Sequence, residues 1–398
     1  MTDLSSARVA PPSVRPTAPT AGPSAPPRKI AQVSPWLGEA EAQAVADVVR
    51  GGWITEGPHA RAFSDQLNHL IGTPYGVLAP NGTLALALGL MALEIGQGDE
   101  VLVPDTTFIG SATAVHMVGA VPVLVDVDDQ TFQIDMNRAA AGLTSRTRAI
   151  MPVHLFGTAC DMTAVLDFAV KHRLAVIEDA AQGIGVTFGG RHVGSLGDVG
   201  CFSFFADKTI TTGEGGYVAC KDQHVYNRLR LLRNQGRLDR GSFIHEAIGY
   251  NFRMTDLQCA IGVAQLARLD QVISRKTELL QRYQAGLQRI SAVRMLGAAP
   301  NAGHVPFRCV LMAQDVRGLM THLEAAGVET RSFFHPLHRQ PGLRAWSASR
   351  VEGMHLDDAS FPNANYGWDH GVCLPIQPTL SLAEVDFICD SIAEFYGV

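Results

Sequence analysis

The stretch "LAVIEDAAQGIGVTFGGRHVGSLGDVGCFSFFADKTITTGEGGYVAC" (residues 174–220) contains three short apolar runs, each of a length typical of a buried strand. These runs are "LAVIED" (174–179), "VGCFSF" (199–204) and "GGYVAC" (215–220). The first run ends in two carboxylates, Glu178 and Asp179, and the second is followed closely by Lys208. Charged side chains beside core strands are costly unless a partner or ligand meets them. The stretch therefore predicts buried strands that carry chemistry at their ends.

The same alternation extends toward the N-terminus. Four more strand-like runs are "YGVLAP" (75–80), "EVLVPD" (100–105), "VPVLVDVD" (121–128) and "AIMPVHLF" (149–156), and helical patterns cover 83–96, 110–119 and 162–173. Strands that alternate with helices predict an α/β fold with a mostly parallel, seven-stranded, doubly wound sheet flanked by helices. In such a sheet, ligands bind at the carboxyl ends of the strands.

The pattern changes from about residue 275. Strand-like runs (304–312, 329–334 and 371–376) accompany a helical stretch (315–327), and Ser381 and Glu384 form a capping box before the last helix. We expect a large domain at 30–274 and a smaller C-terminal α+β domain at 275–398. Residues 1–29 are rich in Pro and Ala and predict a disordered tail without a secretory signal.

Composition excludes several classes of protein. The chain has 398 residues and a formal net charge of −6, without a long basic run, so we expect no nucleic-acid partner. Apolar runs stay shorter than the length that spans a membrane. Seven cysteines occur singly, which indicates reduced thiols in a cytoplasmic protein and no metal site.

Asn81, Gly82 and Thr83 lie where a predicted strand meets a predicted helix. Glycine permits close approach of a ligand to the backbone, and the first N–H groups of a helix have no partner within the helix. This junction is therefore a candidate phosphate site. An ordinary helix cap, without a ligand, would use the same residues.

The pair Glu178–Asp179 ends a predicted strand, so only one of the two side chains points toward the ligand side. A structural ion pair, a helix cap or a cation-binding role would each satisfy a carboxylate there. The metal alternative lacks the ligand spacing that usually accompanies it.

Lys208 could be a surface charge, a phosphate contact or a nucleophile. The glycines of "GIGVTFGG" (183–190) miss the dinucleotide-binding spacing, and Lys208 precedes its glycines, unlike the lysine of a P-loop. A partly desolvated lysine can instead act as a nucleophilic amine. Pyridoxal 5′-phosphate (PLP) requires a lysine, an acid and a phosphate cradle, and Lys208, the pair Glu178–Asp179 and the junction at Gly82 supply all three at predicted strand ends.

These motifs resemble one family. The run "VIEDAAQGIGVTFGGRHVGSLGDVGCFSFFADKTITTGEGGYV", with "GGWITEGP" (51–58), "VHLFG" (153–157) and "GYNFRMTDLQCAIGVAQLARLD" (249–270), is similar to the sugar-nucleotide aminotransferases of the StrS/DegT-like family. The resemblance covers about residues 30–395. It implies a fold-type I PLP-dependent transferase and an obligate homodimer whose two active sites are shared between subunits.

The resemblance also implies roles for individual residues. Lys208 matches the lysine that forms the Schiff base with PLP, and Asp179 matches the acid beside the pyridine nitrogen. The other cofactor-binding positions that match are Gln182, Phe108, Gly82, Thr83, Ser203 and, from the neighbouring subunit, Asn251. For the substrate, the candidates are Arg253, as a partner for the carboxylate of the amino donor, and Arg331, His335 and His338, as lining of the sugar-nucleotide pocket.

The implied reaction moves the amino group of L-glutamate to a keto-sugar nucleotide in aminosugar biosynthesis. The first candidate acceptor is GDP-4-keto-6-deoxy-D-mannose, which would give GDP-perosamine. Other acceptors remain open: a dTDP- or UDP-linked keto sugar, a cyclitol such as inosose, or the precursor of aminohydroxybenzoate. One branch of the family performs 3-dehydration with a histidine in place of the lysine, and Lys208 argues against it. A catalytically silent PLP-fold regulatory or binding protein is the alternative from another class.

Overall fold

The computed structural model describes residues 29–237, 243–350 and 356–398. The predicted N-terminal tail therefore lies outside the described residues, apart from Lys29. None of the helices in these three ranges combines the length and the apolarity needed to cross a membrane.

The central sheet has seven strands in the order β1-β9-β8-β5-β4-β2-β3. Their bounds are β1 Tyr75–Ala79, β2 Glu100–Pro104, β3 Val121–Val125, β4 Thr147–Ile150, β5 Ala175–Asp179, β8 Val199–Ser203 and β9 Gly216–Cys220. Only β9 runs against its neighbours; it pairs antiparallel with both β1 and β8. The predicted mostly parallel sheet is confirmed, and all seven strands overlap the predicted runs.

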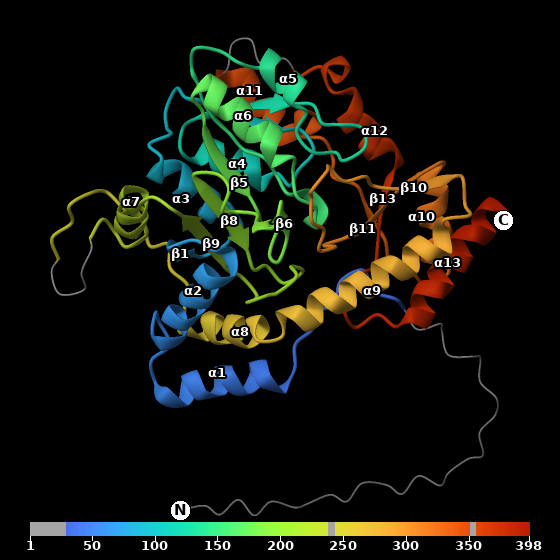
Figure 1. The fold of residues 1–398 in the computed structure, drawn as a ribbon, viewed down its shortest axis with the longest axis horizontal. Coiled ribbons are helices and arrows are strands. Elements are labelled where there is room, and N and C mark those ends of the chain that lie inside the picture. Colours follow the sequence, from blue (N-terminus) through green and yellow to red (C-terminus); the bar gives the residue numbers. More distant parts are fainter. Residues whose placement is uncertain (1–28, 238–242, 351–355) are drawn as a thin grey trace, which may run out of the picture.

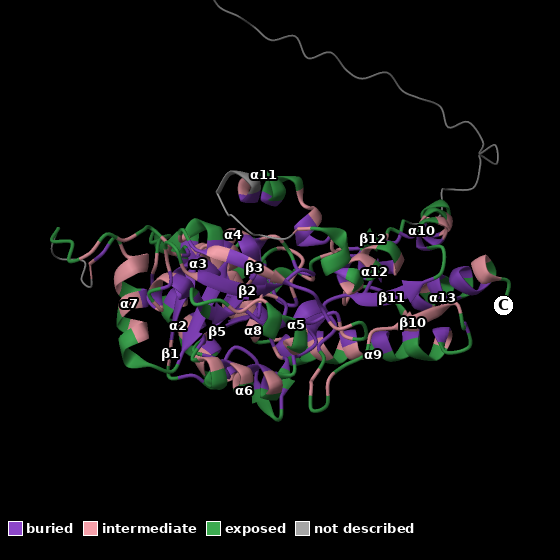
Figure 2. Ribbon diagram, turned by 90° about the horizontal axis from the view of Figure 1, so that it is seen from above, coloured by how far each residue is buried: buried purple, intermediate pink, exposed green. Residues whose placement is uncertain are grey.

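Helices cover both faces of this sheet (Figure 1). Along each strand, alternate side chains enter opposite cores, as strand geometry requires. For example, Leu102 packs in one core while Val101 and Val103 pack in the other. The first core includes α2 Pro58–Ile71, α6 Met162–His172 and α8 Asp256–Leu266, and the second includes α3 Gly82–Ala92, α4 Gly110–Met117 and α7 Gln223–Arg233. Figure 2 shows the strands buried between helices whose outer surfaces are exposed.

A second, antiparallel sheet follows in the order β10-β11-β13-β12. Its strands are β10 Val293–Met295, β11 Cys309–Ala313, β12 Arg331–Ser332 and β13 Gly371–Leu374. They share a core with α9 Leu269–Leu287, α10 Val316–Ala325 and α13 Leu382–Tyr396, and Ser381 caps α13 as predicted. The helix α9 runs without a break across the predicted domain boundary at 274/275, and that boundary stays a prediction.

The remaining elements are short or peripheral. They are α1 Glu39–Gly51, α5 Met136–Ala141, α11 Pro341–Arg350, α12 Pro362–His370, the hairpin of β6 Thr187–Phe188 and β7 Arg191–His192, and the 3-10 turns η1 Leu155–Gly157, η2 Leu337–Arg339 and η3 Asp358–Ser360. The turn η2 contains His338, one of the predicted substrate residues.

Candidate active site

A cavity of about 680 Å³ opens at the carboxyl ends of the parallel strands. Its lining includes eight of the predicted site residues: Gly82, Thr83, Phe108, Asp179, Gln182, Ser203, Lys208 and Arg331. These residues are far apart in the sequence and meet because β1, β2, β5 and β8 all end at the same edge of the sheet. This location is where an open α/β sheet binds its ligands.

The strand-to-helix junction at Gly82 is crowded. The Asn81 side chain caps α3 by accepting a hydrogen bond from Leu84 N–H at 2.9 Å. A Cβ atom added to Gly82 would lie 2.8 Å from Ser203 Cβ, so only glycine fits between the two strand ends. The cap and the glycine together present the first backbone N–H groups of α3, beside the Ser203 hydroxyl, to an anion in the cavity.

The adjacent carboxylates Glu178 and Asp179 point in opposite directions. Glu178 points away from the cavity and accepts hydrogen bonds from the N–H groups of Gly194, Leu196 and Gly197 at 2.6–2.7 Å. The His154 ring donates to Glu178 as well, at 3.0 Å, because its other nitrogen accepts from Cys160 N–H. Burial raises the pKa of Glu178, but these donors outweigh burial and hold the pKa below its ordinary value. Glu178 is therefore a structural anion.

Replacing Glu178 with Gln should destabilise the fold by about 3 kcal/mol, because the amide nitrogen would face N–H donors and His154 would lose its anionic partner. Urea unfolding measures this loss. A lowered carboxylate pKa contributes stability at neutral pH, and this stability is lost as the carboxylate is protonated in acid. The difference in unfolding free energy between variant and parent should therefore become smaller toward low pH. The exposed residue Glu39 offers the control Glu39→Gln, and an equal effect of the two changes would contradict the assignment.

Asp179 points into the cavity. Its carboxylate accepts hydrogen bonds from the Ser111 hydroxyl at 2.7 Å and from Ala181 N–H at 3.1 Å. Burial raises the pKa of Asp179, and the hydrogen bond from Ser111 and the charge of Lys208 oppose that rise. A buried carboxylate with a raised pKa is stabilised by a cation placed against it.

Lys208 lines the same cavity as Asp179 and lies in the loop that follows β8. Its Nζ lies 4.5 Å from the centre of the Phe307 ring. Burial lowers the pKa of Lys208, while the charges of Asp207 and Asp179 oppose the shift. A lowered pKa increases the fraction of neutral amine, which is the nucleophilic form.

Gln182 and Phe108 complete the wall of the cavity. The Gln182 side-chain oxygen accepts a hydrogen bond from Phe156 N–H at 2.6 Å, which fixes the amide and turns its nitrogen into the available donor. Phe108 is 60% exposed although it is a large apolar residue. An aromatic ring displayed at a cavity wall can stack on a planar ligand.

Four predicted residues, all within the described part of the chain, lie outside the cavity lining. Asn251 accepts a hydrogen bond from the Arg253 guanidinium at 2.8 Å, and both are on the surface. His335 packs edge-on against Trp368. His338, in η2, is fully buried, and its ring nitrogens lie 2.6 and 3.0 Å from the carboxylates of Asp105 and Asp358. The expectation that His338 lines the substrate pocket therefore fails, since both ring nitrogens are occupied by these carboxylates.

The model of the DegT/DnrJ/EryC1/StrS aminotransferase family matches residues 35–393. The chain belongs to this family. The predicted class of enzyme, a PLP-dependent aminotransferase of fold type I, is confirmed.

Individual members of the family are similar over nearly their whole length. GDP-perosamine synthase of Escherichia coli O157:H7 is 37% identical over 91% of this chain and 97% of its own. The crystal structure of DesV from S. venezuelae in complex with a ketimine intermediate has a TM-score of 0.83, with 32% identity over 89% of this chain and 94% of that chain. Spr1654 from Streptococcus pneumoniae in its PLP form has a TM-score of 0.86, with 28% identity over 93% and 99% of the two chains.

The residues present in this family member fit PLP. The cavity combines an amine, a buried carboxylate that gains from an opposing cation, and a helix N-terminus that a glycine keeps open. Each of these features matches one part of the cofactor: its aldehyde, its ring nitrogen and its phosphate.

The sequence patterns did not predict three residues that line this cavity. Ser111 orients Asp179, Asp207 precedes the lysine, and Arg308 binds Asp207. Asp207 could have been noticed as a charge next to Lys208. Ser111 and Arg308 carry no local signal, because their partners lie 68 and 101 residues away in the sequence.

Proposed function

We propose that this enzyme transfers the amino group of L-glutamate to a keto-sugar nucleotide, with GDP-4-keto-6-deoxy-D-mannose as the first candidate and GDP-perosamine as its product. The observation that supports this proposal best is that Lys208, Asp179 and the helix N-terminus at Gly82 line one cavity. The chain that forms this cavity is similar to GDP-perosamine synthase. The same arrangement argues against a catalytically silent binding protein, which has no need of a nucleophilic lysine.

The side chains have separate tasks in this proposal. PLP, when bound, supplies a carbonyl that accepts the amino group and a ring that stores an electron pair. Lys208 Nζ is the amine that holds the cofactor and that moves a proton at the substrate carbon as general base and acid. Asp179 holds the proton on the ring nitrogen, and Ser111 fixes the orientation of its carboxylate. Gly82, Thr83 and Ser203 bind the phosphate.

The cavity has room and charge for a nucleotide-linked substrate. Its volume of about 680 Å³ lies within the range for sites that hold large organic ligands. Arg331 lines it with a half-exposed guanidinium whose nearest carboxylate, Asp207, lies 3.7 Å away. We propose that Arg331 binds an anionic group of a substrate, which is either a carboxylate of L-glutamate or a phosphate of the sugar nucleotide. Arg253 and His335 keep their proposed substrate roles only if a second subunit or a bound substrate brings them into contact.

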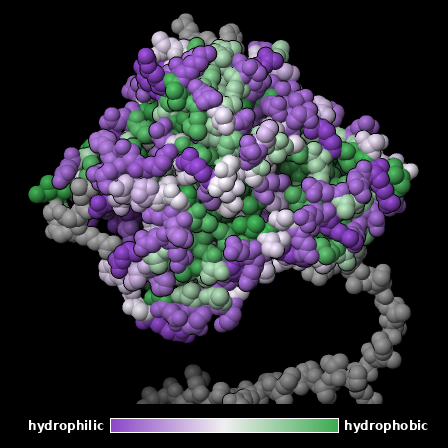
Figure 3. All heavy atoms as spheres, in the orientation of Figure 1, coloured by the Kyte–Doolittle hydropathy of each residue, from purple (hydrophilic) through white to green (hydrophobic). Residues whose placement is uncertain are grey.

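A second copy of the chain completes the site in this proposal. Phe205, at the cavity wall, is exposed like Phe108. The loop after α7 projects from the molecule and carries Phe243, Ile244 and Ile248, each at least 72% exposed. Figure 3 shows a hydrophobic tip at that edge. Such a projecting apolar loop favours burial against a partner. Asn251, on the surface at the end of the same loop, would then reach the phosphate in the neighbouring subunit.

The cytoplasm is the compartment that we propose. All seven cysteines lie in the described residues, and all are buried and unpaired. Reduced thiols of this kind are typical of a reducing compartment.

The test is a screen of amino acceptors. With L-glutamate as donor, GDP-, dTDP- and UDP-linked 4-keto sugars are compared with free cyclitol ketones, and 2-oxoglutarate release is measured. We expect the GDP-linked sugar to react with the highest kcat/KM. Preference for a cyclitol would contradict the substrate class, and PLP binding without turnover of any acceptor would favour the silent binding protein.

A further inference from the structure

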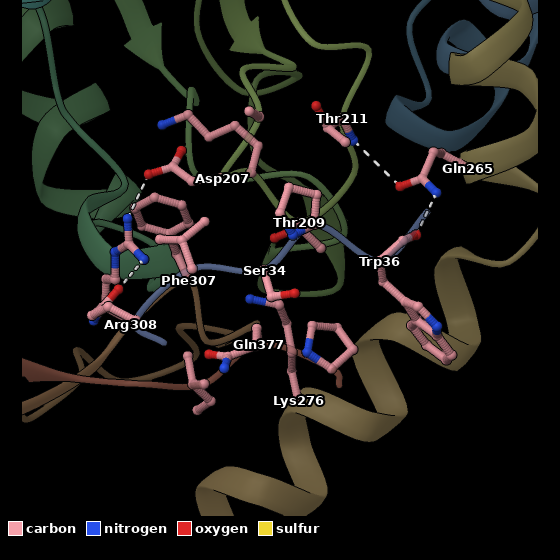
Figure 4. Close-up of a pocket in the computed structure, with 17 residues that line it drawn as sticks. Ser34, Trp36, Asp207, Thr209, Thr211, Gln265, Lys276, Phe307, Arg308 and Gln377 are labelled. Atoms are coloured by element: carbon pink, nitrogen blue, oxygen red, sulfur yellow. Dashed lines mark hydrogen bonds and ion pairs between the residues drawn. The ribbon is translucent and has the colours of Figure 1, made fainter. Parts of the chain in front are cut away.

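Lys208 also lines a second, smaller cavity of about 30 Å³. Figure 4 shows the residues around this cavity. Six segments line it: residues 32–36, residues 206–209 with Thr211, Gln265 of α8, Lys276 of α9, the pair Phe307–Arg308, and residues 376–378. The loop 206–211 carries Lys208 itself, and Asp207 lines both this cavity and the large one. The small cavity, which we call the Lys276 cavity, therefore shares a wall with the candidate active site.

Lys276 is a buried cation that the proposed reaction does not use. Its side chain is 4% exposed, and it extends from α9 toward the loop that carries Asp207 and Thr209 (Figure 4). Its Nζ donates a hydrogen bond to Pro306 O at 3.0 Å. An ammonium group has three N–H donors, and a backbone carbonyl does not neutralise its charge. A lysine buried in this way requires further acceptors and an anion.

Acceptors that match Lys276 line the same cavity. Three buried oxygen atoms in the lining have no hydrogen-bond partner among the described residues: Asp207 Oδ1, Thr209 Oγ1 and Gln377 Oε1. Unsatisfied buried polar atoms are rare in folded proteins and mark sites of ordered water. A cavity of about 30 Å³ exceeds the minimum that one water molecule occupies, and polar walls favour its filling.

We propose that the Lys276 cavity holds an ordered water molecule that links Lys276 Nζ to Asp207. Through Asp207, Lys276 then acts as a positioning residue for Lys208. Asp207 is the central member of this cluster. Its Oδ2 accepts a hydrogen bond from the Arg308 guanidinium, which leaves Oδ1 for the water. Arg308 is held in turn by Gln32, whose side-chain oxygen accepts from it at 2.7 Å.

The charges around the two lysines predict the direction of the effect. Asp207 and Asp179 favour the protonated form of Lys208, whereas burial and Arg308 oppose it. Burial and Arg308 also lower the pKa of Lys276, to about 7, and Asp207 opposes that shift. Lys276 and Arg308 thus share one anion with Arg331, whose guanidinium lies 3.7 Å from the Asp207 carboxylate. Without Lys276, Asp207 would act more strongly on Lys208, and the nitrogen of Lys208 would hold its proton to higher pH.

The experiment rests on the proposed role of Lys208 and reads the cofactor spectrum rather than turnover. The absorbance of PLP bound to the enzyme is titrated against pH in the parent, Lys276→Met, Asp207→Asn and the double variant. We expect the midpoint to rise by about one pH unit in Lys276→Met and to fall by about one unit in Asp207→Asn. In the Asp207→Asn background, Lys276→Met should shift the midpoint no further, because the two residues act as one unit.

Two further variants separate the water from the charge and from misfolding. Thr209→Val removes one lining hydroxyl without changing the charge and should shift the midpoint in the same direction as Lys276→Met, but less. Lys171→Met, at an exposed site on α6, should leave the midpoint unchanged. Thermal unfolding checks that each variant folds, and methionine matches the length of the buried lysine.

The outcomes are distinct. An unchanged midpoint in both Lys276→Met and Thr209→Val overturns the water site and its role. A full shift by Lys276→Met in the Asp207→Asn background overturns the action through Asp207. A parent enzyme that takes up no PLP would instead refute the proposed function, on which this inference rests.

Discussion

Lys208→Ala should reduce amino transfer from L-glutamate at least about 1,000-fold while the fold is retained. The variant loses both the amine that holds the cofactor and the group that moves the proton. The side chain makes few contacts that stabilise the fold: it packs on Phe307, and its positive charge is near Asp207 and Asp179. Rapid mixing with glutamate, followed at the absorbance of the cofactor, measures the rate of the half-reaction.

The control for this change is Lys171→Ala, at an exposed site of α6, which should leave the rate unchanged. Borohydride treatment of the parent should attach the cofactor covalently to the peptide that contains Lys208, and mass spectrometry locates the attachment. Retained transamination in Lys208→Ala, or attachment at another lysine, would refute the role of Lys208.

Asp179→Asn should reduce amino transfer by roughly 100- to 10,000-fold, because a neutral amide cannot hold the proton on the ring nitrogen as a carboxylate does. The expected effect on stability has the opposite sign from that of Glu178→Gln. Burial raises the pKa of Asp179, so its negative charge is costly in the absence of a cation, and the amide should leave the apo protein as stable as the parent or more stable.

Measurements of turnover and of urea unfolding on the same variants show which of Glu178 and Asp179 serves the reaction and which serves the fold. The exposed residue Asp167 offers the control Asp167→Asn, which should change neither quantity. Strong destabilisation by Asp179→Asn with normal turnover of the folded fraction would show a structural carboxylate instead.

The sequence was sufficient for the parts of the site that lie at strand ends. Buried strands have a strong local signal, so the runs at 75–80 and 174–179 placed Gly82 and Asp179 at the correct edge of the sheet. It could not decide which of Glu178 and Asp179 faces the ligand. That choice depends on the turn at Gly194–Gly197, whose N–H groups bind Glu178.

The predictions for the C-terminal region were weaker for a related reason. His338 precedes Arg339 in a stretch that looks like a polar pocket lining, yet Asp105 and Asp358 bind its ring in the interior. The sequence gives no indication of such a pairing, because Asp105 lies 233 residues away. Arg308 escaped notice in the same way, since its partner Asp207 lies 101 residues away in the sequence.

The antiparallel strand β9 also sets an order for folding. β1 lies at the edge of the sheet and, among the described strands, pairs with β9 alone. Tyr75 and the rest of β1 therefore join the sheet only when the segment that ends at Cys220 is in place. Loop closure over such a distance in the sequence is slow compared with the formation of the neighbouring helices. The wall between Gly82 and Ser203 is complete only after that closure. The part of the cavity that would hold the cofactor phosphate therefore depends on a strand pairing between residues distant in the sequence.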